Sequence, residues 1–456
     1  MSGLFGTLSV ALSGLQAQQG ALEITANNVA NANTPGYSRE RPDLVESDPV
    51  VIGSLTFGSG VTLRNAEAVR DPILELRLNQ ETQQQGLFDS TASAMQQVQV
   101  LFNGNGDDLG TQVTNFFNSL QQLSGNPSDL SQRQGVLTAA GNLATAFHTT
   151  VTNLQSQRDS LDLSVGQTVD QINLYTKQIA ELNSQISGLQ NLHQNADTFI
   201  DQRNNVIRQL SGLIDIAEVQ SNGGLTITTT SGTPLVAEGQ SFSLDTQVDP
   251  SGVNHIFAQG EDITSKITAG TLAGILDARD QEIPQLLGDL DTLASGLSSS
   301  LNAAHQAGFD LSGNPGGNLF SPSPAGGSGA AADISVAITD PAKLAASSDG
   351  SPGSNGNLTQ LLAVQNQAIA NGESPTSFYA GMVYRVGTSV ANATAEQDAS
   401  NQILQQLQDQ RSSISGVSMD EEASNMIQYE RAYEAAARVI STIADMTDTA
   451  IQLGKY

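Results

Sequence analysis

Apolar residues recur every three or four positions at both ends of the chain. At the start they run from Leu4 to Val29, and at the finish from Ala423 to Ile451. This spacing places them on one face of a helix, which is buried against another helix. We therefore predict two terminal helices that pair as a coiled coil and form an assembly interface. The predicted interface residues are Leu4, Leu8, Leu15, Leu22, Val29, Met426, Tyr433, Ala437, Ile440, Ala444 and Ile451.

Glycine weakens the first of these helices. Gly3, Gly6, Gly14 and Gly20 each cost about 1 kcal/mol of helix stability relative to alanine. We therefore expect residues 1–33 to be disordered in the free chain and to fold when a neighbouring copy covers the apolar face. In the simplest alternative, the two terminal stripes pack on each other within one chain.

Several turn and cap signals divide the rest of the chain. Thr34-Pro35-Gly36 ends the first helix, and an extended segment follows over 38–70. Asp71-Pro72 is typical of a helix start, here a helix that runs towards Phe102. The Asn- and Gly-rich stretch 103–108 is a predicted loop. Further helices are predicted over about 109–124, 128–191, 195–212 and 272–307, and from Leu358 to the end with a break at 415–417.

A β-rich character replaces the helical pattern between about 216 and 267. The run from Leu225 to Thr230 is rich in β-branched residues, and the turn 231–234 follows it. Low-complexity loops rich in Gly, Ser and Pro are predicted over 310–332 and 347–356.

The predicted fold is mainly α with a β insertion, in a nested multi-domain order. Residues 1–35 and 420–456 form a terminal coiled-coil domain. Residues 36–215 and 273–419 form a core domain of long helices, and residues 216–272 form a small β-rich outer domain.

Composition favours this picture over one large globular core. Only 38% of the 456 residues are hydrophobic and 4% are aromatic. This composition suits long helices whose surfaces are largely exposed to solvent. A net charge of −28 argues against nucleic acid and anionic membranes as partners. Without Cys there is neither disulfide nor thiolate chemistry. No apolar run approaches the ~20 residues of a membrane span, and a basic signal-peptide start is absent. Cytoplasm is therefore the default location, unless an export route without a cleaved signal operates.

Catalytic chemistry finds no support in the sequence. The four histidines lie far apart, and common nucleophile, phosphate-loop and zinc motifs are missing. Asn103, Asn105 and Asp107 imitate only part of a calcium loop. The acidic cluster 420–422 falls in the first turn of a helix, where carboxylates favour the helix dipole. We predict no catalytic, cofactor-binding or metal-binding residues, no cofactor and no enzyme activity.

An Asn-rich motif ends the first predicted helix. It resembles the signature shared by bacterial flagellar rod, hook and hook-associated axial proteins. Stretches at 415–423 and 429–440 narrow the resemblance to the first hook-associated protein family, and shorter ones at 116–120, 126–128, 201–204 and 307–310 extend it along the chain. Where larger relatives carry extra β material, this chain has only the loop 310–332. The motif residues are Asn27, Asn28, Asn31, Asn33, Thr34, Pro35, Gly36 and Tyr37.

This resemblance implies a structural protein of the extracellular bacterial flagellum. Such proteins leave the cell by type III export and form a ring at the hook–filament junction, which permits filament assembly. The implied partners are other copies, the hook protein, the next hook-associated protein, the export apparatus, and an export chaperone that binds the C-terminal helix over about 418–453. Nucleic acid binding and membrane insertion are not implied.

Alternative interpretations remain open at this point. One is a hook or rod subunit of the same superfamily, and another is a surface adhesin role for the β insertion. A third is an enzyme carried on the axial structure.

Overall fold

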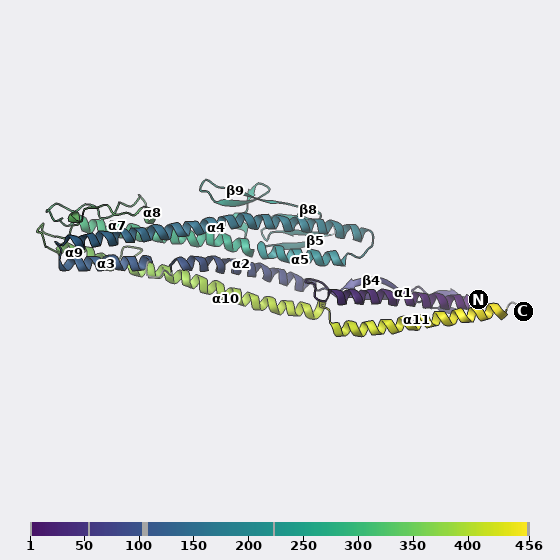
Figure 1. Cartoon of the computed structure of the whole chain (residues 1–456). Helices are drawn as coiled ribbons and strands as arrows, with labels where there is room; N and C mark the ends of the chain where they lie inside the picture. Colours follow the sequence, from purple (N-terminus) through teal and green to yellow (C-terminus); the bar gives the residue numbers. More distant parts are fainter. Residues whose placement is uncertain (1, 53–54, 103–107, 222–223, 454–456) are drawn as a thin grey trace. The chain divides into compact units, whose positions relative to one another are not determined.

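The computed structural model describes residues 2–52, 55–102, 108–221 and 224–453. Long helices dominate it, and small antiparallel sheets lie alongside them (Figure 1), which confirms the predicted mainly α fold with a β insertion. The helices are α1 (Ser2–Asn31), α2 (Pro72–Phe102), α3 (Leu109–Gly125), α4 (Leu130–Asn191), α5 (Asp197–Leu213), α6 (Gly270–Asp277), α7 (Ile283–Gln306), α8 (Ala330–Asp333), α9 (Gly356–Ala363), α10 (Pro375–Ser415) and α11 (Met419–Leu453). The strands are β1 (Glu40–Glu46), β2 (Val50–Ile52), β3 (Leu55–Phe57), β4 (Val61–Ala68), β5 (Ala217–Ser221), β6 (Gly224–Thr228), β7 (Pro234–Ala237), β8 (Gln240–Ser241), β9 (Leu244–Val248), β10 (Asn254–Ala258) and β11 (Glu261–Asp262).

The chain divides into two compact units. We call Met1–Gln83, Ile172–Ser243 and Ser400–Tyr456 the terminal unit, because it contains both chain ends. The central unit comprises Gln84–Gln171 and Leu244–Ala399. Helices α2, α4 and α10 contribute residues to both units.

The β-rich segment forms two separate sheets. Strands β5, β6, β7 and β8 form one sheet in the terminal unit, whereas β9, β10 and β11 form another in the central unit. Each sheet forms hydrogen bonds with a different part of α4. Asn183 Nδ2 donates to the Leu225 and Glu238 carbonyls at 3.1 and 2.7 Å. Asp162 accepts the backbone N–H of Asn254 at 2.9 Å. The sequence treats 216–272 as one insertion, but these contacts distribute its strands between the two units.

Aromatic packing closes the core of the central unit. Phe116 and Phe117 on α3 are edge to face at 5.4 Å, and Phe116 contacts Phe320 in the same manner at 5.9 Å. Phe320 lies in the low-complexity stretch and is fully buried, and Asn302 on α7 accepts its backbone N–H at 2.9 Å. That stretch is therefore an ordered part of the core.

One predicted helix boundary is wrong. The predicted helix from Leu358 to the end is interrupted before α10, where Ala370 and Glu373 form a β-bridge. Asn371 and Gly372 adopt left-handed φ values of 47° and 85°, and an Asn-Gly turn followed by Pro375 stops a helix. A π-helical turn, Ala278–Glu282, joins α6 to α7.

The expected disorder of residues 1–33 is not what the structure shows. Residues Ser2–Asn31 form a continuous helix that packs against α11 of the same chain. The chain's own C-terminal helix covers the apolar face of α1, which is the alternative in which the two terminal stripes pack on each other within one chain.

Candidate assembly interface

Helices α1 and α11 pack side by side in opposite directions, so that the start of α1 lies beside the end of α11 (Figure 1). Near one end Asn28 meets Glu422, with Nδ2 3.1 Å from Oε2. At the other end Leu4 and Leu8 line a cavity together with Ile443 on α11. The buried line between the two helices, which we call the seam, therefore extends along nearly their whole length.

The predicted interface residues fall into two groups by exposure. The five on α1 are partly buried, as are Met426, Tyr433, Ala437 and Ile440 on α11, whereas Ala444 and Ile451 are exposed. The structure thus brings most of both stripes to the seam. The most deeply buried apolar positions of the pair are others: Ala11, Ala17, Ala21, Ile24 and Ile443.

A β hairpin covers the side of α1 that faces away from α11. Ser13 Oγ accepts the Val61 N–H at 3.3 Å, and a Cβ on Gly20 would lie 2.4 Å from Leu63 of β4. On a helix at about 100° per residue, positions 13 and 20 lie opposite the seam. The sequence assigned residues 36–70 to the core domain, but β1 and β4 pack on α1. Small residues at 17, 20 and 21 are the signal that could have indicated this second buried face.

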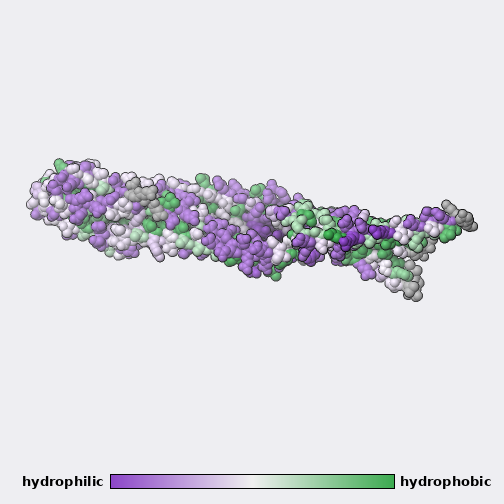
Figure 2. Space-filling model, turned by 60° about the horizontal axis from the view of Figure 1, so that its bottom comes forward, coloured by the Kyte–Doolittle hydropathy of each residue, from purple (hydrophilic) through white to green (hydrophobic). Residues whose placement is uncertain are grey.

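An apolar groove lies between the free ends of the two helices. Its volume is about 460 Å³, and we refer to it as the apolar groove. In the part of Figure 2 where α1 and α11 lie, hydrophobic side chains (green) reach the surface. The groove is lined mainly by Leu4, Phe5, Leu8, Ile440, Ala444 and Ile451.

Asn28 connects three segments at the other end of the pair. Its Oδ1 accepts the Glu40 N–H at 2.9 Å and the Tyr37 hydroxyl at 2.8 Å, and its Nδ2 donates to the Glu40 carbonyl at 2.8 Å. Asn28 and Glu422 are both almost fully buried. Burial and the nearby Glu40, Asp201 and Glu422 carboxylates raise the pKa of Tyr37, so its hydroxyl stays a donor.

The other motif residues shape the turn after α1. Asn31 Nδ2 donates to the Asn27 carbonyl at 3.0 Å, and Thr34 Oγ1 donates to Asn31 Oδ1 at 3.1 Å. Gly36 has a φ of 83°, which a side chain would strain. Asn33 and Pro35 are exposed. We call the cluster of Asn28, Tyr37, Ser38, Arg39 and Glu422 the motif joint.

Hydrogen bonds and ion pairs connect the motif joint to other helices of the terminal unit. Asp201 on α5 accepts the Ser38 N–H at 2.8 Å and Arg70 Nε at 2.8 Å. Arg39 N–H donates to the Ser415 carbonyl at the end of α10 at 2.8 Å, and its guanidinium pairs with Glu421. The joint therefore fixes where α1 ends and α11 begins.

A second ion-pair cluster lies beside the motif joint. The Glu75 carboxylate on α2 accepts from Arg411 on α10 at 2.5 Å and also pairs with Arg208 on α5. Arg411 additionally donates to the Gly36 carbonyl at 2.9 Å. These partners are distant in sequence, so no local pattern of residues predicts them.

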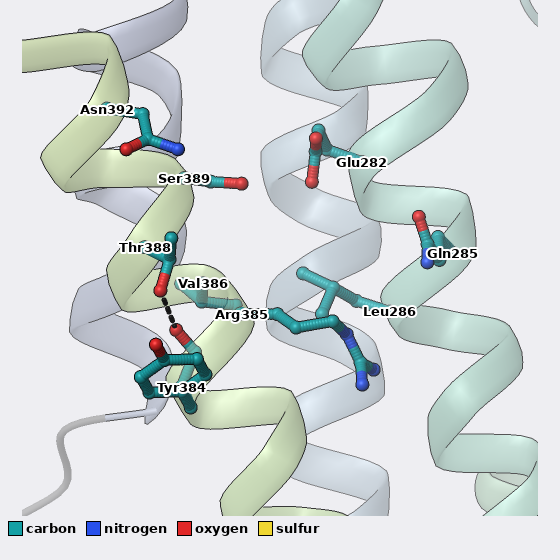
Figure 3. Close-up of a pocket in the computed structure, with 9 residues that line it drawn as sticks. All are labelled: Glu282, Gln285, Leu286, Tyr384, Arg385, Val386, Thr388, Ser389 and Asn392. Carbon is teal, nitrogen blue, oxygen red and sulfur yellow. Dashed lines mark hydrogen bonds between the residues drawn. The ribbon is translucent and has the colours of Figure 1, made fainter.

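A polar cavity of about 270 Å³ lies between α7 and α10 in the central unit (Figure 3). Arg385 reaches from α10 towards α7, where it pairs with Asp289. Burial and the neighbouring Asp277 raise the pKa of Glu282. The nine lining residues do not include a histidine or another base in hydrogen-bond contact with a hydroxyl nucleophile.

The structure describes residues 2–52, 55–102, 108–221 and 224–453, and these ranges also bear on metal binding and membrane insertion. Within them, His and acidic side chains do not form a group of three that could ligate a metal ion. Each described helix is too short or too polar to cross a bilayer. The helix pair and its motif joint are therefore the candidate functional site.

Family models match three stretches of the chain. Residues 95–320 match the flagellar hook-associated protein FlgK helical domain. The two ends match rod models: residues 8–37 match the flagella basal body rod protein, and residues 408–453 match the flagellar basal body rod FlgEFG protein C-terminal model. The rod-type matches coincide with α1 and α11.

Curated relatives match along nearly the whole chain. Flagellar hook-associated protein 1 of Bacillus subtilis is 30% identical, covering 99% of this chain and 98% of the relative. The Escherichia coli protein of the same name is 26% identical, covering 97% and 98%. In fold, the chain is similar to the flagellar hook junction protein FlgK from Burkholderia pseudomallei, with a TM-score of 0.67 and 20% identity over 74% of this chain and all of that one.

Proposed function

The chain belongs to the flagellar hook-associated protein 1 family, and we propose that it is a structural subunit of the hook–filament junction of the bacterial flagellum. In this role it permits the filament to assemble on the hook. The observation that carries the proposal is the helix pair, whose rod-type ends leave large apolar side chains exposed. The hook-associated helical domain at 95–320 favours this function over that of a hook or rod subunit.

The proposed assembling part is the terminal coiled-coil domain, residues 1–35 and 420–456. In the apolar groove, Ile440, Ala444 and Ile451 remain accessible, which suits contact with another copy. In this proposal β1 and β4 cover α1 within one chain, and the rest of the helical core, 71–215 and 273–419, lies outside the assembling layer together with the β-rich residues 216–272. The motif residues fix the direction of the chain between the two parts, because Asn28 joins α1, β1 and α11.

The proposed partners are other copies in a ring, the hook protein, and the next hook-associated protein towards the filament. We further propose type III export without a cleaved signal, assisted by a chaperone that binds α11. The exposed Val439, Met446 and Leu453 on α11 offer that chaperone an apolar surface before assembly. The final location is extracellular. Members of this family are structural proteins, and we propose no enzyme activity for this chain.

A clean deletion strain tests the proposal. Electron microscopy of its surface is combined with an assay for flagellin in the medium. Bare hooks with unassembled flagellin outside the cell are the expected result. A strain without hooks would contradict the junction role and favour a rod or hook subunit, and normal filaments would remove the proposed function altogether.

A further inference from the structure

We propose that His305 is an acid-sensitive latch, which holds a buried segment of the central unit in place only while its imidazole is neutral. The segment is residues 341–347, which we call the strap. It is hydrogen-bonded to His305 at the end of α7, and its residues Leu344, Ala345 and Ala346 have no exposed surface. The proposal goes beyond the structural role of the chain, because it adds a response of the central unit to pH.

Both ring nitrogens of His305 have partners inside the protein. The residue has no exposed surface, its Nδ1 lies 2.8 Å from the Gly317 carbonyl oxygen, and its Nε2 accepts the Ala345 backbone N–H at 2.9 Å. A carbonyl oxygen can only accept, so Nδ1 carries the proton and Nε2 carries the lone pair. The ring is therefore neutral, and it joins the loop after α7 to the strap.

Arg133 of α4 binds the strap at the same peptide group. Its Nη1 donates to the Leu344 carbonyl at 2.6 Å, and its Nε donates to the Pro127 carbonyl at 2.6 Å. Arg133 is 2% exposed, and its charge is permanent. The Leu344 carbonyl and the Ala345 N–H belong to one peptide group. Arg133 thus binds this group at its oxygen and His305 binds it at its nitrogen.

Protonation of His305 would break this arrangement. The added proton would occupy Nε2, which would then face the Ala345 N–H as a second donor and leave that buried group without an acceptor. It would also place a second positive charge near Arg133. Burial and the charge of Arg133 accordingly lower the pKa of His305, whereas the hydrogen bond to Gly317 acts in the opposite direction.

The charged groups around the latch do not neutralise a protonated His305. The Asp310 carboxylate accepts two backbone N–H groups of its own turn at 2.8 and 2.9 Å, and its charge acts on Arg133. Helices α3 and α9 have no charged residue. Among the described residues of the other packed elements, Asp340, Lys343 and Asp349 are exposed, Asp129 caps the start of α4, and Asp291 lies nearly four turns away along α7.

Neutral groups hold the strap at its other contacts. Phe309 and Ser347 exchange two backbone hydrogen bonds at 2.7 and 3.2 Å. Asn357 on α9 donates to the Ala345 carbonyl at 2.8 Å. Amide and peptide groups do not titrate near neutral pH. A pH dependence of the strap in this range is therefore expected to come from His305.

The pH window follows from the direction of the pKa shift. When the strap is detached, His305 regains its ordinary pKa of about 6.5, and when the strap is in place the pKa is lower. The closed form then binds fewer protons than the open form. It is fully favoured above about pH 6.5 and loses stability as the pH falls below that value. The equilibrium constant for opening is expected to rise about tenfold per pH unit until the lower pKa is reached.

Amide hydrogen exchange of the full chain tests the latch. Opening of 341–347 is measured from about pH 7.5 to about pH 5, with each rate divided by the intrinsic exchange rate at that pH. In the unaltered chain we expect the tenfold rise per pH unit. In His305→Gln we expect no such rise, because the amide side chain can donate and accept but cannot take up the proton. His193→Asn is the matched control: His193 is exposed with a φ of 56°, which Asn tolerates, and the variant is expected to follow the unaltered chain.

Three results would overturn the proposal. They are opening that does not change with pH, opening that changes equally in His305→Gln, and a parallel loss of protection in α3, which would indicate general acid unfolding. If His305→Gln does not fold, hydrogen exchange at the imidazole carbon of each histidine in the unaltered chain decides instead. His305 is expected to titrate below the exposed His193, and equal titration of the two would refute the latch.

The proposed location gives the latch its setting. Outside the cell the central unit would meet the pH of the medium, which the cell does not buffer. This last step rests on the proposed function. The exchange measurement on the purified chain does not, so a chain that lacks the latch leaves the junction role intact, and a deletion strain with normal filaments leaves the latch intact.

Discussion

Helices α3 and α11 show two ways of using the same apolar periodicity. In α3, seven of 17 residues are buried, among them Phe116, Phe117 and Leu120. In α11, which is twice as long, only Glu422 and Ile443 are buried. The central unit therefore provides α3 with all of its packing partners within the chain. The terminal unit covers one side of α11 and leaves the other side apolar and exposed, which is the difference expected between a core helix and an assembling helix.

Loss of an aromatic ring in the central unit is predicted to have the largest effect. Phe116→Ala removes a side chain with no exposed surface and leaves a cavity beside Phe117 and Phe320. The expected cost is about 3–5 kcal/mol of unfolding free energy, measured by chemical denaturation of the full chain. Met446→Ala on α11 is the contrasting variant, expected to change it by less than about 0.5 kcal/mol. Equal losses for the two variants would show that α11 is as fully packed as α3.

The motif joint is predicted to be the main source of order in the terminal pair. Asn28→Ala leaves the buried Glu422 carboxylate and the Glu40 backbone without their partner. Each unsatisfied buried group costs about 1–3 kcal/mol. Amide hydrogen exchange is expected to accelerate in α1 and β1, while α3 keeps its protection. The exposed Asn33→Ala is the matched control, and equal acceleration by the two variants would refute a special role for Asn28.

Gly60 lies just before β4 and close to α1, and we predict that this position does not tolerate a side chain. Its φ is +106°, and a Cβ would lie 2.0 Å from Ser13 Oγ and 3.3 Å from Val10 Cα. Gly60→Ala is therefore expected to cost about 1–3 kcal/mol through backbone strain. The measurement is hydrogen exchange in β4. Unchanged exchange there would mean that the hairpin does not need this close contact with α1.

Gly14→Ala is the smallest predicted effect and has the opposite sign. Nothing lies within 4 Å of a Cβ at this position, so the methyl group fits without displacement. Alanine in a helix interior is more stable than glycine by about 1 kcal/mol. Slower hydrogen exchange across α1 is the expected result. Faster exchange would indicate that Gly14 is needed for a close approach within the chain.

Sequence patterns located elements well where the signal is local. Asp71-Pro72 predicted the start of α2, and Asp71 Oδ1 indeed accepts the backbone N–H groups of Ile73 and Leu74 at 3.0 and 3.2 Å. The Asn371-Gly372 turn before Pro375 is equally local and could have been predicted by the same rules.

Patterns could not assign partners. Periodicity selects the side of α1 that carries Leu4 and Leu8, but it does not say whether the partner is α11 of the same chain or of another. Ser38 binds Asp201, 163 positions away, and no local signal encodes that contact. The division of the β-rich segment between the two units could not be predicted for the same reason. It depends on contacts with Asn183 and Asp162 of α4, which are distant in sequence from the strands.

The near absence of charge from α1 determines how the proposed contact between copies would respond to temperature and salt. Glu23 is the only charged residue in this helix. A contact between apolar side chains weakens on cooling, because the free energy of burying apolar surface becomes less favourable. Added salt screens the mutual repulsion of copies that each carry a net charge of −28. The contact between copies is therefore expected to weaken on cooling and to strengthen when salt is added. A contact held by ion pairs would instead weaken when salt is added.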